Sequence, residues 1–237
     1  MSAQRHVFAD PALAAEACAA RITGLLEQAL GGREFATLAV SGGRTPQLLF
    51  EKMARLKFSW ERVHLFWVDE RCVPPHDPAS NYKLARDAFL QVAHIPERNV
   101  HRILGEIAPK EAAQRYAEEI RRFFGLGASE MPQFDIAQCG MGPDAHTASL
   151  FPGEALIDDR EGIAAAVFAP QFKQWRVTLL PGPLLAAKNL VYLVSGADKA
   201  EVLRAVFQEP LEPRKYPAQL IGRGAEWFLD EAAAGLL

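Results

Sequence analysis

A histidine in a glycine-rich segment is the side chain of this sequence best placed to act as a general base. His146 lies in GMGPDAHTASLFPG (140–153), directly after the apolar run FDIAQC, and Asp144 stands two residues before it. A carboxylate at that spacing can bond one imidazole nitrogen and so leave the other free to take a proton. The alternative, a histidine capping a short helix that begins near Ala145, does not account for so many Gly and Pro residues.

A second segment, SGGRTP (41–46), stands between the apolar run FATLAV and a helical pattern. Adjacent glycines let the backbone approach a ligand closely, and the N–H groups that begin the next helix can hold an anion such as phosphate. The residues that would hold it are Ser41, Gly42, Gly43 and Thr45. The same letters also fit a plain strand-to-helix turn in which Thr45 caps the helix and Pro46 opens it.

Three consecutive charges, Asp69, Glu70 and Arg71, end the very apolar run VHLFWV (63–68). They must lie in a cleft or in solvent, because charged side chains are rarely buried without partners. The two carboxylates could fix the direction of Arg71, whose guanidinium suits a sugar phosphate or a carbonyl oxygen that gains charge. A plain exposed loop, with Ser80 capping the next helix, is the alternative.

Two further cations occupy positions that disfavour a bare charge. Arg176 stands inside the apolar run WRVTLL, so it needs an anionic partner or a strand end that faces a cleft. Lys199 falls in the first turn of a predicted helix, where the helix dipole disfavours a cation. A bound anion would explain both residues, and so would a carboxylate of the protein itself.

These four places can meet only if the surrounding elements bring them to one edge of a sheet. The strand-like runs are 35–40, 63–68, 134–140, 163–169, 175–180 and 189–195, and the helical patterns are 11–30, 45–55, 80–92, 109–124, 182–188, 197–208 and 226–235. Several runs are apolar without strict alternation, which is typical of parallel strands covered on both faces. Ligands bind beyond the carboxyl ends of such strands, where the polar segments stand. The pattern predicts one α/β domain over 1–237, with a doubly wound, mostly parallel sheet and helices on both faces.

The composition argues against several classes of protein. Among 237 residues, 26 Lys and Arg stand against 29 Asp and Glu, so no basic stripe supplies the counterion release that nucleic-acid binding needs. Charges interrupt the N-terminal apolar residues long before the roughly 20 that cross a bilayer, and no signal-peptide pattern is present. Three scattered cysteines favour a reducing compartment without structural zinc. We expect a cytoplasmic monomer with no nucleic-acid or membrane partner and no metal.

The chain resembles the 6-phosphogluconolactonases over nearly its whole length. The resemblance rests on an ordered set of motifs: SGGRTP, VDERCVPP with SNY, FDIAQCGMGPDAHTASLFPG, RVTLL, VSGADKAEVL, PAQL and the ending WFLDEAAAGLL. It implies a Rossmann-like fold of the NagB/RpiA type, which glucosamine-6-phosphate deaminases share. It also implies cofactor-free hydrolysis of 6-phospho-D-glucono-1,5-lactone, a sugar-phosphate substrate of the pentose phosphate pathway.

The resemblance also implies roles for individual residues. His146 would activate water, with Asp144 beside it and Arg71 on the lactone side of the site. The residues expected to bind the substrate and its phosphate are Ser41, Gly42, Gly43, Arg44, Thr45, Asp69, Arg176 and Lys199. Two positions depart from the family pattern, which usually has Gly at 145 and often a small polar residue at 44. If Ala145 needs a positive φ, the strain costs about 1 kcal/mol. Arg44 would add a contact to the phosphate.

Two other functions remain open on the residues alone. A glucosamine-6-phosphate deaminase would share the glycine-rich loop and the D-x-H motif, and Asp69 matches its proton-transferring Asp in type. Those enzymes carry an acidic residue soon after the histidine, whereas TASLFPG has none before Glu154. A non-catalytic sugar-phosphate sensor is the other possibility, although regulators of that kind usually add a DNA-binding helix pair or a basic surface.

Overall fold

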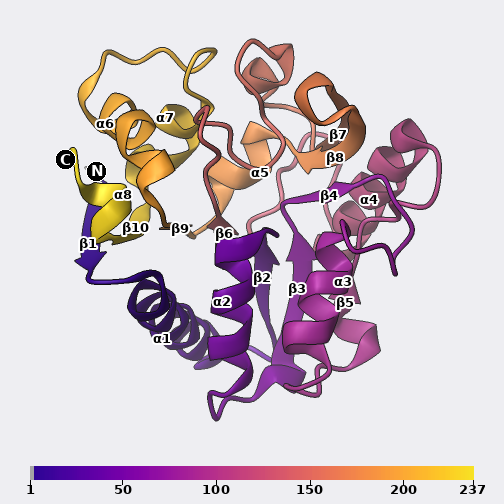
Figure 1. The fold of residues 1–237 in the computed structure, drawn as a ribbon. Helices are drawn as coiled ribbons and strands as arrows, with labels where there is room; N and C mark the ends of the chain where they lie inside the picture. The colour runs from indigo at the N-terminus through magenta and orange to yellow at the C-terminus, as the bar shows by residue number, and fades with distance from the viewer. Residues whose placement is uncertain (1–2) are drawn as a thin grey trace.

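A seven-stranded parallel sheet lies at the centre of the computed structural model, which describes residues 3–237 (Figure 1). The strand order is β1-β10-β9-β6-β2-β3-β5, and every neighbouring pair is parallel. The strands are β1 (Gln4–Phe8), β2 (Ala36–Val40), β3 (Val63–Trp67), β5 (Val100–His101), β6 (Ile136–Cys139), β9 (Asn189–Val194) and β10 (Glu226–Asp230). β2 and β6 are buried at every position, as their apolar runs without alternation predicted.

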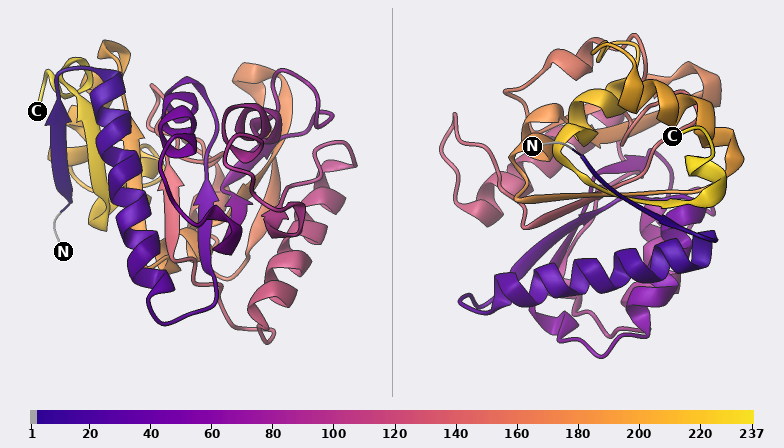
Figure 2. Two further views of the ribbon diagram at one scale, coloured as in Figure 1. Left: turned by 90° about the horizontal axis from the view of Figure 1, so that it is seen from below. Right: turned by 90° about the vertical axis from the view of Figure 1, so that its left-hand side faces the viewer.

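Helices cover both faces of this sheet, with α1 on one face and α6 on the other (Figure 2). The helices are α1 (Pro11–Leu30), α2 (Arg44–Ala54), α3 (Asn81–Ala85), α4 (Pro109–Phe124), α5 (Pro181–Ala186), α6 (Ala200–Gln208), α7 (Pro217–Ile221) and α8 (Glu231–Ala234). Among residues 3–237, none of these helices is long and apolar enough to cross a membrane. The predicted doubly wound, parallel α/β architecture is therefore confirmed.

Three strands form a second, antiparallel sheet, and here one prediction is wrong. β4 (Asp69–Arg71), β8 (Gln174–Leu179) and β7 (Ala164–Ala169) pair in that order, so the runs 163–169 and 175–180 do not join the parallel sheet. Only residues 170–173 connect β7 to β8, which is enough for a hairpin and too short for a parallel crossover. β4 follows β3 after a single residue, Val68, so the chain passes directly from the main sheet into the small one.

The two ends of the chain also differ from the prediction. Residues 226–235 were expected to be one helix, but β10 takes up their first half and pairs with both β1 and β9. The apolar residues of Glu226–Asp230 are buried as a strand between β1 and β9, and this burial outweighs any tendency to extend the helix toward the N-terminus. Only the following residues, EAAA, form a helix, α8. β1 was not predicted, because its residues are mostly exposed at the sheet edge. The predicted helix 80–92 divides into α3 and a π-helical turn, Arg86–Leu90.

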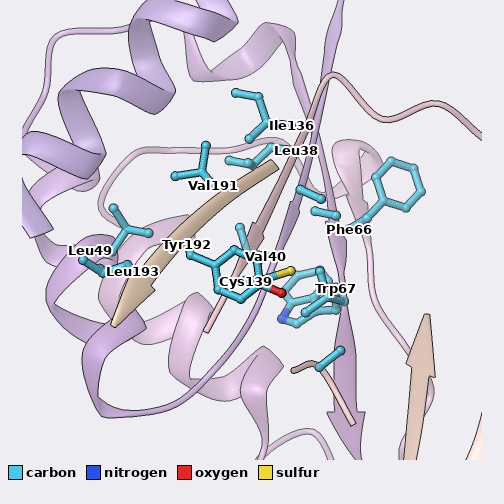
Figure 3. Packing of buried hydrophobic residues seen from close by; sticks show 14 of the residues in the cluster. Leu38, Val40, Leu49, Phe66, Trp67, Ile136, Cys139, Val191, Tyr192 and Leu193 are labelled. Carbon is cyan, nitrogen blue, oxygen red and sulfur yellow. The ribbon is translucent and has the colours of Figure 1, made fainter. Parts of the chain in front are cut away.

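The hydrophobic core lies between the sheet and its helices. Figure 3 shows the side chains of β2, β3, β6 and β9 meeting those of α2, with Val40, Trp67, Cys139 and Tyr192 at the centre. Tyr116 of α4 ties its helix to β3, since its hydroxyl donates to the carbonyl of Trp67 and accepts from the Trp67 N–H, both at 2.8 Å. The core therefore fixes the carboxyl ends of β2, β3, β6 and β9 relative to one another.

Candidate active site

A cavity of about 460 Å³ opens at the carboxyl ends of the parallel strands. From β2 the chain builds β3 and β5 on one side and then returns to place β6 on the other, which makes β2/β6 the switch point where α/β sheets bind ligands. The predicted site residues that line the cavity are Ser41, Gly42, Gly43, Arg44, Thr45, Asp69, Arg71, His146, Arg176 and Lys199. Segments that follow β2, β3, β6 and β9 thus meet in one place, as the sequence predicted.

The charge of the cavity wall favours an anionic ligand. Its charged side chains are four cations, Arg44, Arg71, Arg176 and Lys199, against two carboxylates, Asp69 and Asp198. With a neutral His146, the lining carries a surplus of two positive charges. A phosphorylated small molecule matches that surplus.

Asp144 lies beside the cavity and orients His146. Its Oδ1 is 2.5 Å from Nδ1 of His146 and accepts the backbone N–H of the same residue at 3.2 Å. A carboxylate can only accept, so Nδ1 carries the proton and Nε2 keeps its lone pair. Burial raises the pKa of Asp144, but the hydrogen bonds that its carboxylate accepts from His146 outweigh burial, so this pKa lies below its ordinary value. No helix begins near Ala145, which removes the alternative of a helix cap.

The loop that carries His146 is tight and partly strained. Ala145 is fully buried with φ at +65°, the left-handed region in which a Cβ costs about 1 kcal/mol. At Gly142, an added Cβ would lie 2.0 Å from Cε1 of His146. Thr147 anchors the far end of the loop, since its hydroxyl donates to the carbonyl of Gly140 at 3.0 Å and meets the Tyr192 hydroxyl at 2.8 Å.

Glu70 is buried beneath the cavity wall and organises the segment after β4. Its carboxylate accepts the backbone N–H groups of Arg71, Asn81 and Tyr82, each at 2.7 Å, and the Ser80 hydroxyl at 3.0 Å. Burial raises the pKa of Glu70 despite these four hydrogen bonds. Ser80 also caps α3, as the plain-loop alternative predicted, by accepting from an N–H at 3.1 Å.

Carboxylates do not set the direction of the Arg71 side chain, although the sequence had suggested that Asp69 and Glu70 could do so. Glu70 bonds the backbone of Arg71, and the guanidinium instead donates from Nη1 to the carbonyl of Ala79 at 2.6 Å. Because this acceptor is neutral, the guanidinium of Arg71 forms no ion pair through it, and its positive charge lies at the cavity wall. That charge is available to an anionic or oxyanionic ligand.

Arg176 and Lys199 each have a protein carboxylate nearby and also line the cavity. Nη1 of Arg176 lies 3.8 Å from Oδ2 of Asp69, a long contact, whereas Nζ of Lys199 is 2.6 Å from Oδ2 of Asp198. Burial lowers the pKa of Arg176, while the charge of Asp69 acts in the opposite direction. The two explanations offered by the sequence, a protein carboxylate and a bound anion, are thus compatible for both residues.

The glycine-rich turn before α2 presents uncapped N–H groups. The helix begins at Arg44 rather than after Thr45, and no side chain caps it, because the residue at the cap position is Gly43 with φ at +116°. The alternative in which Thr45 is the cap is therefore wrong. An added Cβ at Gly42 would lie 1.9 Å from Oδ1 of Asn81, so this position needs glycine to pack against α3. Free N–H groups at a helix start bind phosphate well.

Four residues of the site were not singled out from the sequence. Ser149 donates to Oδ2 of Asp69 at 2.7 Å and so joins the histidine loop to β4. Asn81 donates to the carbonyl of Asp69 at 2.9 Å, and Ser195 lines the cavity with a buried hydroxyl that has no partner among the described residues. The fourth, Tyr192, supports Thr147. Of these four, only Ser195 could have been found from the sequence, because it ends an apolar run in the way that Ser41 follows one.

The fold and this cavity define a doubly wound α/β protein with a site for a small anionic molecule at its switch point. The family model described as "Glucosamine-6-phosphate isomerases/6-phosphogluconolactonase" matches residues 9–229, and the chain belongs to that family. The resemblance stated from the sequence motifs is thereby confirmed.

Individual relatives are similar to this chain over most of its length. A 6-phosphogluconolactonase of Synechocystis is 36% identical over 236 residues, covering 98% of each chain. One of Haemophilus influenzae is 38% identical over 207 residues, covering 84% of this chain and 87% of the relative. The solved structure of a 6-phosphogluconolactonase from Trypanosoma cruzi superposes with a TM-score of 0.88 at 27% identity, covering 100% of this chain and 98% of that one.

Proposed function

We propose that this chain hydrolyses 6-phospho-D-glucono-1,5-lactone to 6-phospho-D-gluconate, a step of the pentose phosphate pathway. The observation that carries the proposal is the 2.5 Å pair of Asp144 and His146 at the edge of a cavity with surplus positive charge. Relatives called 6-phosphogluconolactonase, 36% and 38% identical to this chain, support the same reaction.

The reaction is general-base hydrolysis of an ester without a covalent intermediate. Nε2 of His146 takes a proton from a water molecule, whose oxygen attacks C1 of the lactone, and Asp144 stabilises the imidazolium that forms. Negative charge develops on the carbonyl oxygen, where Arg71 or a backbone N–H stabilises it. The bond from C1 to the ring oxygen then breaks, and the proton held by His146 passes to that oxygen. A δ-lactone is already reactive, so a base worth roughly 10²–10⁴ in rate is a substantial share of the catalysis.

The phosphate lies where the cavity offers N–H groups and cations together. The first turn of α2 supplies uncapped N–H groups, and the hydroxyls of Ser41 and Thr45 lie beside them on the cavity wall. Arg44, Arg176 and Lys199 add positive charge around the anionic part of the substrate. Asp69, held by Ser149, balances part of the charge of Arg176 and contacts the sugar.

The arrangement favours lactone hydrolysis over sugar-phosphate deamination. A deaminase must also move a proton between carbons, which calls for a further acid near the histidine. Glu154, the first acid after TASLFPG, is not part of the cavity wall, and one oxygen of Asp69 already accepts from Ser149. A binding protein without activity would keep the phosphate contacts but would have no use for the orienting bond from Asp144 to His146.

We also propose that residues 1–237 are a single domain that works as a monomer in the cytoplasm. One continuous hydrophobic cluster extends from Ala14 to Ala233, which supports the single domain. Light scattering coupled to size-exclusion chromatography tests the monomer, and a dimer mass would refute it.

The decisive experiment follows freshly prepared 6-phosphoglucono-1,5-lactone by time-resolved NMR, with EDTA present, in the presence and absence of the protein. We expect rapid formation of 6-phosphogluconate with protein and slow spontaneous hydrolysis without it. Equal rates in the two samples would refute lactonase activity. Thermal stabilisation by sugar phosphate without turnover would then indicate a sensor.

A further inference from the structure

Two phenylalanines pack against the guanidinium of Arg176. Its Cζ lies 4.6 Å from the ring centre of Phe172 and 5.6 Å from that of Phe151. The two rings are themselves 6.2 Å apart, and Phe151 also lies 4.8 Å from the imidazole of His146. Arg176 is part of the cavity wall and neither phenylalanine is, so the rings contact it from outside the cavity.

Arg176 uses few of its hydrogen-bond donors within the protein. Its side chain is 8% exposed, its contact with Asp69 spans 3.8 Å, and its buried Nε has no partner among the described residues. An aromatic face attracts a guanidinium without occupying any N–H group, because the ring contacts the flat face while the donors lie in the plane. Phenylalanine therefore holds this arginine and leaves its donors free for a ligand.

Phe172 occupies an exposed position that core packing does not explain. It ends the short turn Pro170–Phe172 at the tip of the β7–β8 hairpin and is 50% exposed. The next residue, Lys173, has φ at +48°, in the left-handed region, so the chain turns tightly at the hairpin tip and continues into β8. Arg176 lies in β8, four residues after Phe172, and this turn brings the ring and the guanidinium together.

We propose that Phe172 is a positioning residue for substrate binding, which holds the plane of the Arg176 guanidinium so that its N–H groups face the cavity. The inference rests on the proposed function, in which Arg176 binds an anionic part of the sugar phosphate. The ring also covers one face of the cation, and the exclusion of water from that face strengthens attraction to an anion. Phe151 holds the arginine in the same way and belongs to a small buried cluster with Val167 and Ala169.

The test compares F172A with F168A. Phe168 is a matched control, since it lies on the same hairpin, is 40% exposed and packs on Trp175 instead of Arg176. We expect F172A to raise KM for the lactone about 3- to 20-fold, the range that loss of a cation–π contact gives. We expect kcat to stay within about twofold, because chemistry at His146 is untouched, and F168A to resemble the wild type.

Conservative variants distinguish the effect of the aromatic face from the effect of side-chain size. F172Y keeps the face and should restore KM, whereas F172L keeps an apolar side chain without the face and should not. If Phe172 acts through Arg176, then adding F172A to R176Q should cost almost nothing further. Should F172A fold poorly, the comparison of F172Y with F172L still decides the question.

Calorimetric binding of 6-phosphogluconate distinguishes failure of this inference from failure of the proposed function. A wild type that lacks turnover refutes the function, yet the Kd values of wild type, F172A and F168A still test the role of Phe172. The inference is overturned if F172A and F168A behave alike, if F172L restores binding as well as F172Y, or if kcat falls while KM is unchanged. It is overturned as well if the wild type binds no 6-phosphogluconate, because Arg176 would then have no such anion to bind.

Discussion

At the scale of single residues, the pair of His146 and Asp144 makes the most direct prediction about catalysis. Asn at position 146 keeps a polar side chain of similar size but cannot take a proton. We expect H146N to lower kcat by roughly 10²–10⁴ while KM changes little, since the base acts in the transition state. Steady-state kinetics with H76N as control would check this, because His76 is exposed and lies outside the cavity wall. Wild-type kcat in H146N would show that another group is the base.

Ala145 makes a second prediction at this scale, about stability. Its φ of +65° is strained for any residue with a Cβ, so A145G should raise the free energy of unfolding by about 1 kcal/mol. A112G is the matched control, because Ala112 is equally buried but lies within α4, where glycine costs about 1 kcal/mol. Urea unfolding should give opposite signs for the two variants. Destabilisation by A145G would mean that the loop gains nothing from glycine.

At the scale of elements, Glu70 is the residue on which the segment from β4 to α3 depends. Each oxygen of Glu70 accepts from two donors, so in E70Q two of the four donors would face an NH₂ group instead of an oxygen, which should lower the free energy of unfolding by about 1–3 kcal/mol. Lactone turnover should fall as well, since the same bonds position Arg71 and Asn81. E27Q, at an exposed position of α1, provides the control for both measurements. An E70Q protein as stable as E27Q would show that these bonds contribute no net stability.

The elements also show what local sequence can predict. Convergence of the segments at Ser41, Asp69, His146 and Lys199 was predictable, because the carboxyl ends of parallel strands share one edge. The separate sheet of β4, β8 and β7 was not, since an apolar run does not reveal which partner it pairs with. For the same reason the bond from Ser149 to Asp69, which joins residues 80 positions apart, had no local signal.

At the scale of the whole molecule, a chain of hydrogen bonds links the main sheet to α4 away from the cavity. Nδ1 of His64 in β3 lies 2.9 Å from Nε2 of His101 in β5, whose Nδ1 lies 2.7 Å from Oε1 of Glu119. Burial, and then the nearby His101 and Arg98, lower the pKa of His64 to about 4. Phe35 and Phe123 pack against the same imidazole. A proton on His64 would therefore add charge to a largely apolar cluster.

This cluster predicts how stability depends on pH. The unfolded chain protonates His64 near its ordinary pKa of about 6.5, whereas the folded protein does so only near pH 4. Between these values the unfolded state binds more protons, so the free energy of unfolding should fall as pH drops from about 6.5 to 4, by roughly 1–2 kcal/mol after solvent screening. Below pH 4 this contribution is constant. Urea unfolding across pH 4–8 should show a smaller fall for H64Q than for the wild type or for H76Q. If H64Q keeps the full pH dependence, the destabilisation by acid arises from other groups.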